Sequence, residues 1–119
     1  IPNSLMYNIV SPALQRYLKF FDRSQLLVLQ YEKCSADPRV EIRKTYNFLG
    51  IDADFIPPRL NEKINKIDYT IPKIPSPQRQ RLVEFYWDDV RSTVKLFPEI
   101  DLSLWADFCN ANKYRNTNK

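Results

Sequence analysis

Apolar residues recur at steps of three and four along much of this chain, which is the spacing of one face of a helix. The first such stretch is residues 11–21, where Ser11 is a capping residue and Pro12 fits the first helical turn. A second stretch begins at Asp37, another capping residue, and ends at Gly50, a residue that commonly stops a helix. The pattern therefore predicts two helices in the first 50 residues.

The strongest helical pattern starts at the Ser-Pro pair at residues 76–77 and ends before Pro98. Its apolar face is expected at four-residue steps, on Leu82, Tyr86, Val90 and Val94. Between the second and third helices, residues 51–75 contain four prolines and no sustained periodicity, which predicts a long irregular connection.

A last short helix is expected near the C-terminus. Asp101 can cap it, and Trp105 is expected to anchor it by packing against a sheet. Residues 110–119 are polar and poor in apolar side chains, so they are expected to form a frayed tail.

Residues 25–30, QLLVLQ, follow a different pattern, because their apolar residues run together without alternation. Such a run is typical of a parallel strand that is covered on both faces. A strand between helices indicates an α/β fold, although no second strand is apparent. We therefore expect a helix-rich α/β fold with one recognisable buried parallel strand, which is incomplete by itself.

Composition excludes several classes of site. The chain has no histidine, which removes Ser-His-Asp and Cys-His nucleophilic sites and every metal site that needs histidine. Its single glycine, Gly50, cannot build a glycine-rich phosphate loop. Cys34 and Cys109 form neither a CxxC pair nor a zinc cluster, so we expect no bound metal and two free thiols in a reducing cytoplasm.

Length and charge limit the classes of protein to which the chain can belong. A chain of 119 residues with 44% hydrophobic and 27% charged residues is expected to be one folded domain. A net charge of +4 favours anionic partners only weakly, and no nucleic-acid motif is present. No apolar run is long enough to span a membrane. The chain opens on Ile1 without a secretory signal, and we expect it to be part of a longer protein.

Several short motifs occur in an order that resembles one known family. They are a helix at residues 14–18, QLLVLQYE at residues 25–32, Asp-Pro at residues 37–38 and NFLGI at residues 47–51. Further similarity lies at residues 71–72, 82–86 and 101–105. Over residues 7–108 the chain resembles the C-terminal half of sulfotransferases that use 3′-phosphoadenosine 5′-phosphosulfate (PAPS), especially the bacterial and heparan-sulfate-type branch.

The resemblance implies that residues 1–109 are the C-terminal portion of a sulfotransferase domain with a P-loop-like fold. The family transfers a sulfuryl group from PAPS to a hydroxyl or amine acceptor. Its 5′-phosphosulfate loop and its catalytic base come from an N-terminal part that this chain lacks. The catalytic residues are therefore unknown, and the chain alone is expected to be inactive.

By the same resemblance, Lys63, Asn65, Lys66 and Tyr69 are expected to bind the 3′-phosphate of PAPS or of its product PAP. Positively charged side chains and N–H donors on a loop are suited to binding a phosphate. The alternative is that Lys63 and Lys66 are ordinary loop lysines exposed to solvent. Tyr7 is expected to border the acceptor cleft.

Two other functions stay open. The first is a non-enzymatic helical module for protein interaction, which the amphipathic helices and the missing phosphate loop favour. The second is a basic nucleic-acid binder, for which the chain offers little charge and no motif.

Overall fold

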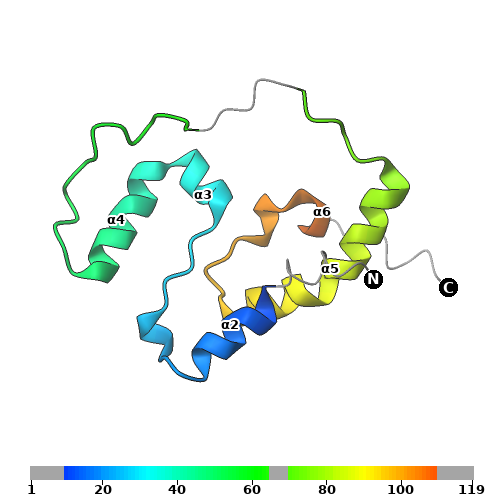
Figure 1. Cartoon of the computed structure of the whole chain (residues 1–119), viewed down its shortest axis with the longest axis horizontal. Coiled ribbons are helices and arrows are strands. Elements are labelled where there is room, and N and C mark those ends of the chain that lie inside the picture. The colour runs from blue at the N-terminus through cyan, green and yellow to red at the C-terminus, as the bar shows by residue number, and fades with distance from the viewer. Residues whose placement is uncertain (1–9, 65–69, 110–119) are drawn as a thin grey trace. The chain divides into compact units, whose positions relative to one another are not determined.

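The structure is a computed structural model that describes residues 10–64 and 70–109. The chain divides into two compact units, one made of residues 1–26 and 74–119 and the other of residues 27–73. Figure 1 shows the helices. In chain order the elements are α2 (Ser11–Leu18), the 3-10 helix η1 (Arg23–Gln25), α3 (Tyr31–Ala36), α4 (Pro38–Leu49), α5 (Ser76–Leu96), the 3-10 helix η2 (Leu102–Leu104) and α6 (Ala106–Cys109).

The expected α/β fold is wrong, because no residue within 10–64 or 70–109 belongs to a β-strand. Gln25 ends η1, and the backbone at Leu26 and at Gln30 is extended, but residues 26–30 are not part of a strand. A strand is stabilised by hydrogen bonds to a neighbouring strand, and the described residues provide no such neighbour. Leu29 is also exposed, so the run is not covered on both faces.

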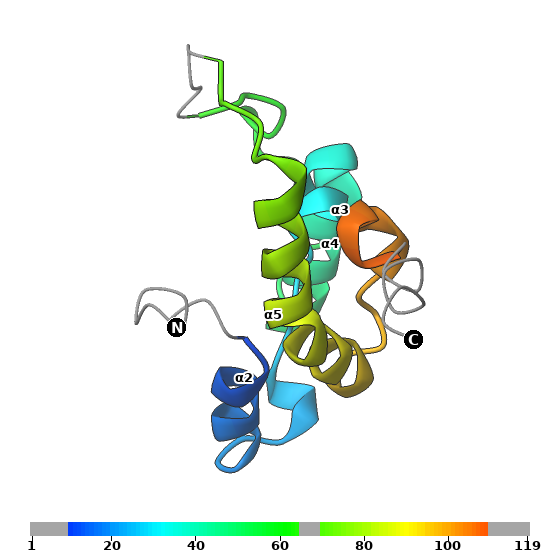
Figure 2. The ribbon, with the colours of Figure 1, turned by 90° about the vertical axis from the view of Figure 1, so that its right-hand side faces the viewer.

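In the first unit, the start of α2 is held by a side chain of α5, which lies beside it (Figure 2). The Asp89 carboxylate accepts hydrogen bonds from the backbone N–H groups of Val10 at 3.0 Å and Ser11 at 2.7 Å. Ser11 was expected to cap this helix, but it is the first helical residue, and its hydroxyl accepts from Gln15 instead. The N–H groups left open at the helix start are therefore satisfied from a distant part of the chain.

The buried face of α5 is displaced from the face that the sequence pattern predicts. Val90 is buried, as predicted, but Val83 is also buried, and Phe97, which follows the helix, is fully buried. These residues recur every seven positions, whereas Leu82 and Val94 of the predicted face are only half-buried. A broad apolar stripe fixes which side of a helix is buried, but its neighbours decide which edge of that stripe is fully covered.

The side chain of Arg23 contacts two residues that follow the C-terminal end of α5. Its guanidinium lies 4.2 Å from the ring centre of Phe97 and forms an ion pair with Glu99. It also donates a hydrogen bond of 2.9 Å to the carbonyl of Leu26. One side chain thereby links η1 to the end of α5 by a cation–π contact and an ion pair, and its bond to Leu26 holds it in place.

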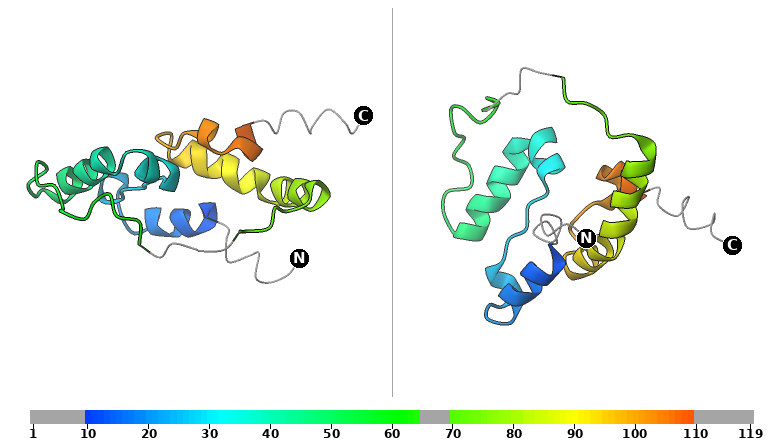
Figure 3. Two further views of the ribbon diagram at one scale, coloured as in Figure 1. Left: turned by 90° about the horizontal axis from the view of Figure 1, so that it is seen from above. Right: turned by 45° about the vertical axis from the view of Figure 1, so that its right-hand side comes forward.

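The C-terminal elements begin as the sequence predicts, with Asp101 accepting from Ser103 N–H at 2.9 Å at the start of η2. The short helix α6 lies along α5 (Figure 3). Trp87 of α5 stacks on Phe108 of α6 with ring centres 6.4 Å apart. The expectation that Trp105 anchors this helix on a sheet is wrong, since the described residues contain no sheet and Trp87 makes the stacking contact.

The second unit contains α3 and α4. No helix was predicted over residues 31–36, but α3 forms there and leads directly to Asp37. The Asp37 carboxylate accepts from Val40 N–H at 3.3 Å and caps α4. Gly50 ends α4 with φ of 70°, in the left-handed region that glycine tolerates. The predicted start and end of this helix are confirmed.

The predicted polar tail, residues 110–119, lies outside the described residues. No helix within the described ranges is both long and apolar enough to cross a membrane.

Candidate functional site

The segment that follows α4 is irregular, as predicted, and contacts with α4 fix its first part. The N–H of Ile51 donates to the Tyr46 carbonyl at 3.0 Å. Arg43 forms an ion pair with Asp54 at 3.1 Å, and the rings of Tyr46 and Phe55 have centres 6.4 Å apart. These contacts direct the chain back along α4.

A turn then leads to the first candidate site residue. The N–H of Leu60 donates to the Pro57 carbonyl at 3.2 Å, and the N–H of Glu62 donates to the Arg59 carbonyl at 3.1 Å. The same two residues form an ion pair, with Arg59 Nε 2.7 Å from Glu62 Oε2. The Glu62 carboxylate is therefore neutralised next to the following residue, Lys63.

Lys63 is exposed and makes no hydrogen bond or ion pair with another described residue. Its ammonium group is accessible to an anionic ligand, as a phosphate contact requires. The other expected site residues, Asn65, Lys66, Tyr69 and Tyr7, lie outside the described residues. The structure therefore places one of the five and does not bring the set together.

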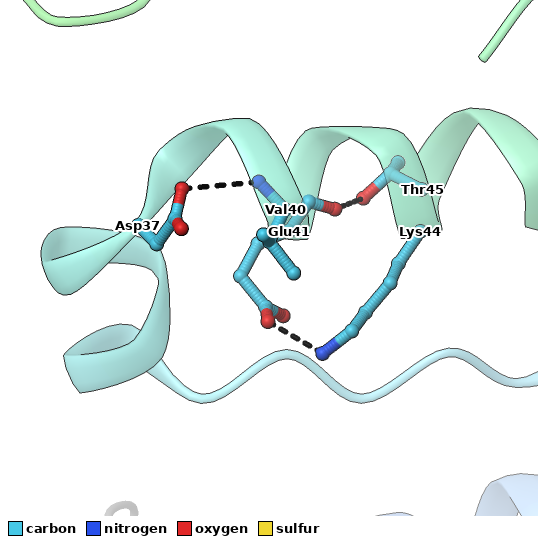
Figure 4. Close-up of polar contacts among 5 residues, drawn as sticks. All are labelled: Asp37, Val40, Glu41, Lys44 and Thr45. Carbon is cyan, nitrogen blue, oxygen red and sulfur yellow. Dashed lines mark hydrogen bonds and ion pairs between the residues drawn. The ribbon is translucent and has the colours of Figure 1, made fainter.

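An ion pair on α4 between a buried carboxylate and a half-exposed lysine was missed by the sequence analysis. The side chain of Glu41 is 8% exposed, and its Oε1 lies 2.5 Å from Lys44 Nζ. Both side chains extend from the same side of α4 toward the extended segment before α3 (Figure 4). The backbone carbonyl of Glu41 accepts from the Thr45 hydroxyl at 2.9 Å. The spacing of three residues between Glu41 and Lys44 indicates an ion pair, but not its burial.

Glu32 lies in the first turn of α3, half-buried, rather than at the end of a strand. Its side chain makes no hydrogen bond or ion pair with another described residue. Cys34 is partly buried and Cys109 is exposed, and both are free thiols.

Comparison with known families identifies the chain. A family model described as a sulfotransferase domain matches residues 3–73, which is more than half of the sequence. The chain belongs to the sulfotransferase domain family. No curated protein and no solved structure matches it significantly.

In this sulfotransferase chain, the matched span contains α2, α3, α4 and the segment with Lys63. All five expected site residues lie inside it. Helices α5 and α6 lie beyond residue 73, so the similarity of that region to the family's terminal helices stays a prediction. Across residues 10–64 and 70–109, no three His, Cys, Asp or Glu side chains form a group that could hold a metal ion.

Proposed function

We propose that this chain forms part of an enzyme that transfers a sulfuryl group from PAPS to a hydroxyl or amine acceptor, in the bacterial and heparan-sulfate-type branch of the family. The match of the sulfotransferase domain to residues 3–73 carries this proposal. In such a transfer the acceptor oxygen or nitrogen attacks sulfur, the bond from sulfur to the bridging phosphate oxygen breaks, and PAP leaves. The acceptor proton passes to a base. Positioning and charge neutralisation dominate chemistry of this kind.

Lys63, Asn65, Lys66 and Tyr69 bind the 3′-phosphate in this proposal. The exposed and unpaired ammonium of Lys63 supports it, because a phosphate oxygen takes up a charge-assisted hydrogen bond from such a group. The ion pair between Arg59 and Glu62 supports it further, since the carboxylate nearest in sequence is already compensated. Tyr7 borders the acceptor.

The remaining chemistry belongs to residues outside this sequence. The family's 5′-phosphosulfate loop and catalytic base have no counterpart in these 119 residues. We therefore assign residues 1–109 to the C-terminal portion of the domain and expect an N-terminal half to supply both parts. The free thiols of Cys34 and Cys109 fit a reducing cytoplasm, where we place the protein.

A helical module for protein interaction is the alternative. It is favoured by the amount of apolar surface that the described residues leave exposed, including Phe20 of the α2 end and Tyr31 of α3 at 82% and 78%. Exposed apolar patches are typical of protein interfaces. Such a module has no reason to distinguish PAP from a nucleotide without a 3′-phosphate.

Calorimetric titration of the 119-residue chain with PAP and with adenosine 5′-phosphate tests the cofactor assignment. We expect PAP to bind about tenfold more tightly, because hydrogen bonds to a charged phosphate are worth about 1.5–3 kcal/mol each. Replacing Lys63 and Lys66 by alanine should remove most of this preference and leave the binding of adenosine 5′-phosphate unchanged.

Lys73 provides a matched control, since it is another exposed lysine of the same unit and lies outside the expected site. Lys73→Ala should keep the preference for PAP. If the double variant also keeps the preference, the phosphate contacts lie elsewhere. If PAP and adenosine 5′-phosphate bind the parent chain equally, the interaction module becomes the better explanation.

A further inference from the structure

The second unit contains a hollow that the proposed transfer reaction does not use. It lies between the N-terminal half of α4 and the segment that returns along it, and its volume is about 240 Å³. Its walls include two arginines of α4, one carboxylate and an apolar floor. The lining residues that matter here are Arg39, Val40, Arg43, Asp54, Phe55 and Ile56.

The two arginines differ in their partners. Arg43 is paired with Asp54 at 3.1 Å, which compensates its charge. The side chain of Arg39 makes no hydrogen bond or ion pair with another described residue. The hollow therefore presents one uncompensated guanidinium, which is a planar group suited to binding an oxyanion through two parallel hydrogen bonds.

The floor of the hollow is apolar and uncovered. Val40, Phe55 and Ile56 are each about half exposed, at 47%, 56% and 46%. The ring contact with Tyr46 holds Phe55 against α4, so this wall is formed without a ligand. A ligand that covers the floor gains hydrophobic stabilisation in addition to the interaction of its charged group with Arg39.

We propose that this hollow is a binding site for a small molecule with one aromatic ring and one oxyanion group, such as an aryl sulfate or aryl carboxylate. The anion pairs with Arg39, and the ring lies on Phe55 and Ile56. A volume of about 240 Å³ is below the roughly 300–1,000 Å³ of sites for drug-sized ligands, so it suits a single ring. The site is separate from Lys63 and does not depend on PAPS.

Phenyl sulfate, inorganic sulfate and phenol are the probes for this site. Each is titrated into the ¹⁵N-labelled 119-residue chain while the backbone amide shifts are followed by NMR. Phenyl sulfate should shift the amides of Val40, Phe55 and Ile56 in a saturable manner. Inorganic sulfate lacks the ring and phenol lacks the anion, so each should bind at least about tenfold more weakly.

Arg39→Gln should weaken phenyl sulfate binding about tenfold and leave the far-UV circular dichroism unchanged, because Arg39 is exposed. Arg91→Gln is the matched control, since Arg91 is an exposed arginine on α5, and it should bind phenyl sulfate like the parent chain. PAP binding should be the same in both variants. Failure of the proposed site beside Arg39 is therefore distinguishable from failure of the cofactor assignment.

The site would be overturned by no shift of these amides with phenyl sulfate, by equal binding of phenol and phenyl sulfate, or by unchanged affinity in Arg39→Gln. Equal weakening by Arg39→Gln and Arg91→Gln would also overturn it, because it would show attraction to net charge rather than a defined contact.

Discussion

In the first unit, individual side chains connect elements that are far apart in the sequence. The Asp89 carboxylate accepts from the first N–H groups of α2, and Arg23 joins η1 to the end of α5 through Phe97 and Glu99. The N–H groups at the start of α2 have no partner nearby in sequence, because Val10 has no side-chain acceptor. Stability at this scale therefore depends on residues far apart in sequence.

Asp89→Ala should lower the free energy of unfolding by about 1–2 kcal/mol, since it leaves the N–H groups of Val10 and Ser11 without their acceptor. Urea denaturation monitored by circular dichroism measures this change. Asp88→Ala is the control, because Asp88 is exposed and its side chain makes no hydrogen bond with another described residue. Equal effects of the two substitutions would show that the carboxylate at position 89 does not hold α2.

At the scale of elements, local chemistry fixes where helices begin and end, whereas packing decides which residues they bury. The ends of α4 follow from Asp37 and Gly50, and both were predicted. The buried edge of α5 was not predicted correctly, because an apolar stripe at helical spacing is broader than the strip that a neighbouring helix covers. Val83 is buried where Leu82 was expected.

Two valines of α5 distinguish the observed face from the predicted one. Val83→Ala should reduce the free energy of unfolding by about 2 kcal/mol, through lost burial and the cavity that remains. Val94→Ala removes the same atoms from a half-buried position and should reduce it by about 1 kcal/mol or less. Chemical denaturation of both variants tests the difference. A larger loss at Val94 would favour the face that the sequence pattern predicts.

At the scale of the whole molecule, the apolar core is small. Among the described residues the buried apolar side chains are Val83, Val90, Phe97 and Ile100, and all four belong to the first unit. The described part of the second unit buries Gln30 and Glu41 but no apolar side chain to the same degree. Such a chain has little hydrophobic stabilisation with which to hold a complete transferase site.

The isolated 119-residue chain should show no PAPS-dependent turnover, because the proposed division of the domain assigns the phosphosulfate loop and the base to an N-terminal half. An assay of PAP release with a panel of hydroxyl and amine acceptors measures this. A polypeptide that joins this chain to a strand and a loop with lysine and serine or threonine is the positive control. Turnover by the isolated chain alone would contradict the proposed division of the domain.

The candidate site was predictable only in part. The irregular segment after Gly50 followed from its prolines and missing periodicity, and Lys63 lies on it as an exposed lysine. The hollow beside Arg39 could not be found in this way, because it requires the segment at Asp54 and Phe55 to return along α4. No local pattern encodes that return.

The sequence by itself determined the helix boundaries set by Asp37, Gly50 and Pro98, the irregular segment and the membership of the sulfotransferase family. Caps and breakers act within a few residues, so their effect can be seen in the sequence. Only the tertiary structure decided that residues 26–30 do not form a strand, that Asp89 caps α2 and that Glu41 is buried. Each of these depends on a partner or a covering segment that lies elsewhere in the chain, and an apolar or charged residue does not specify that partner by itself.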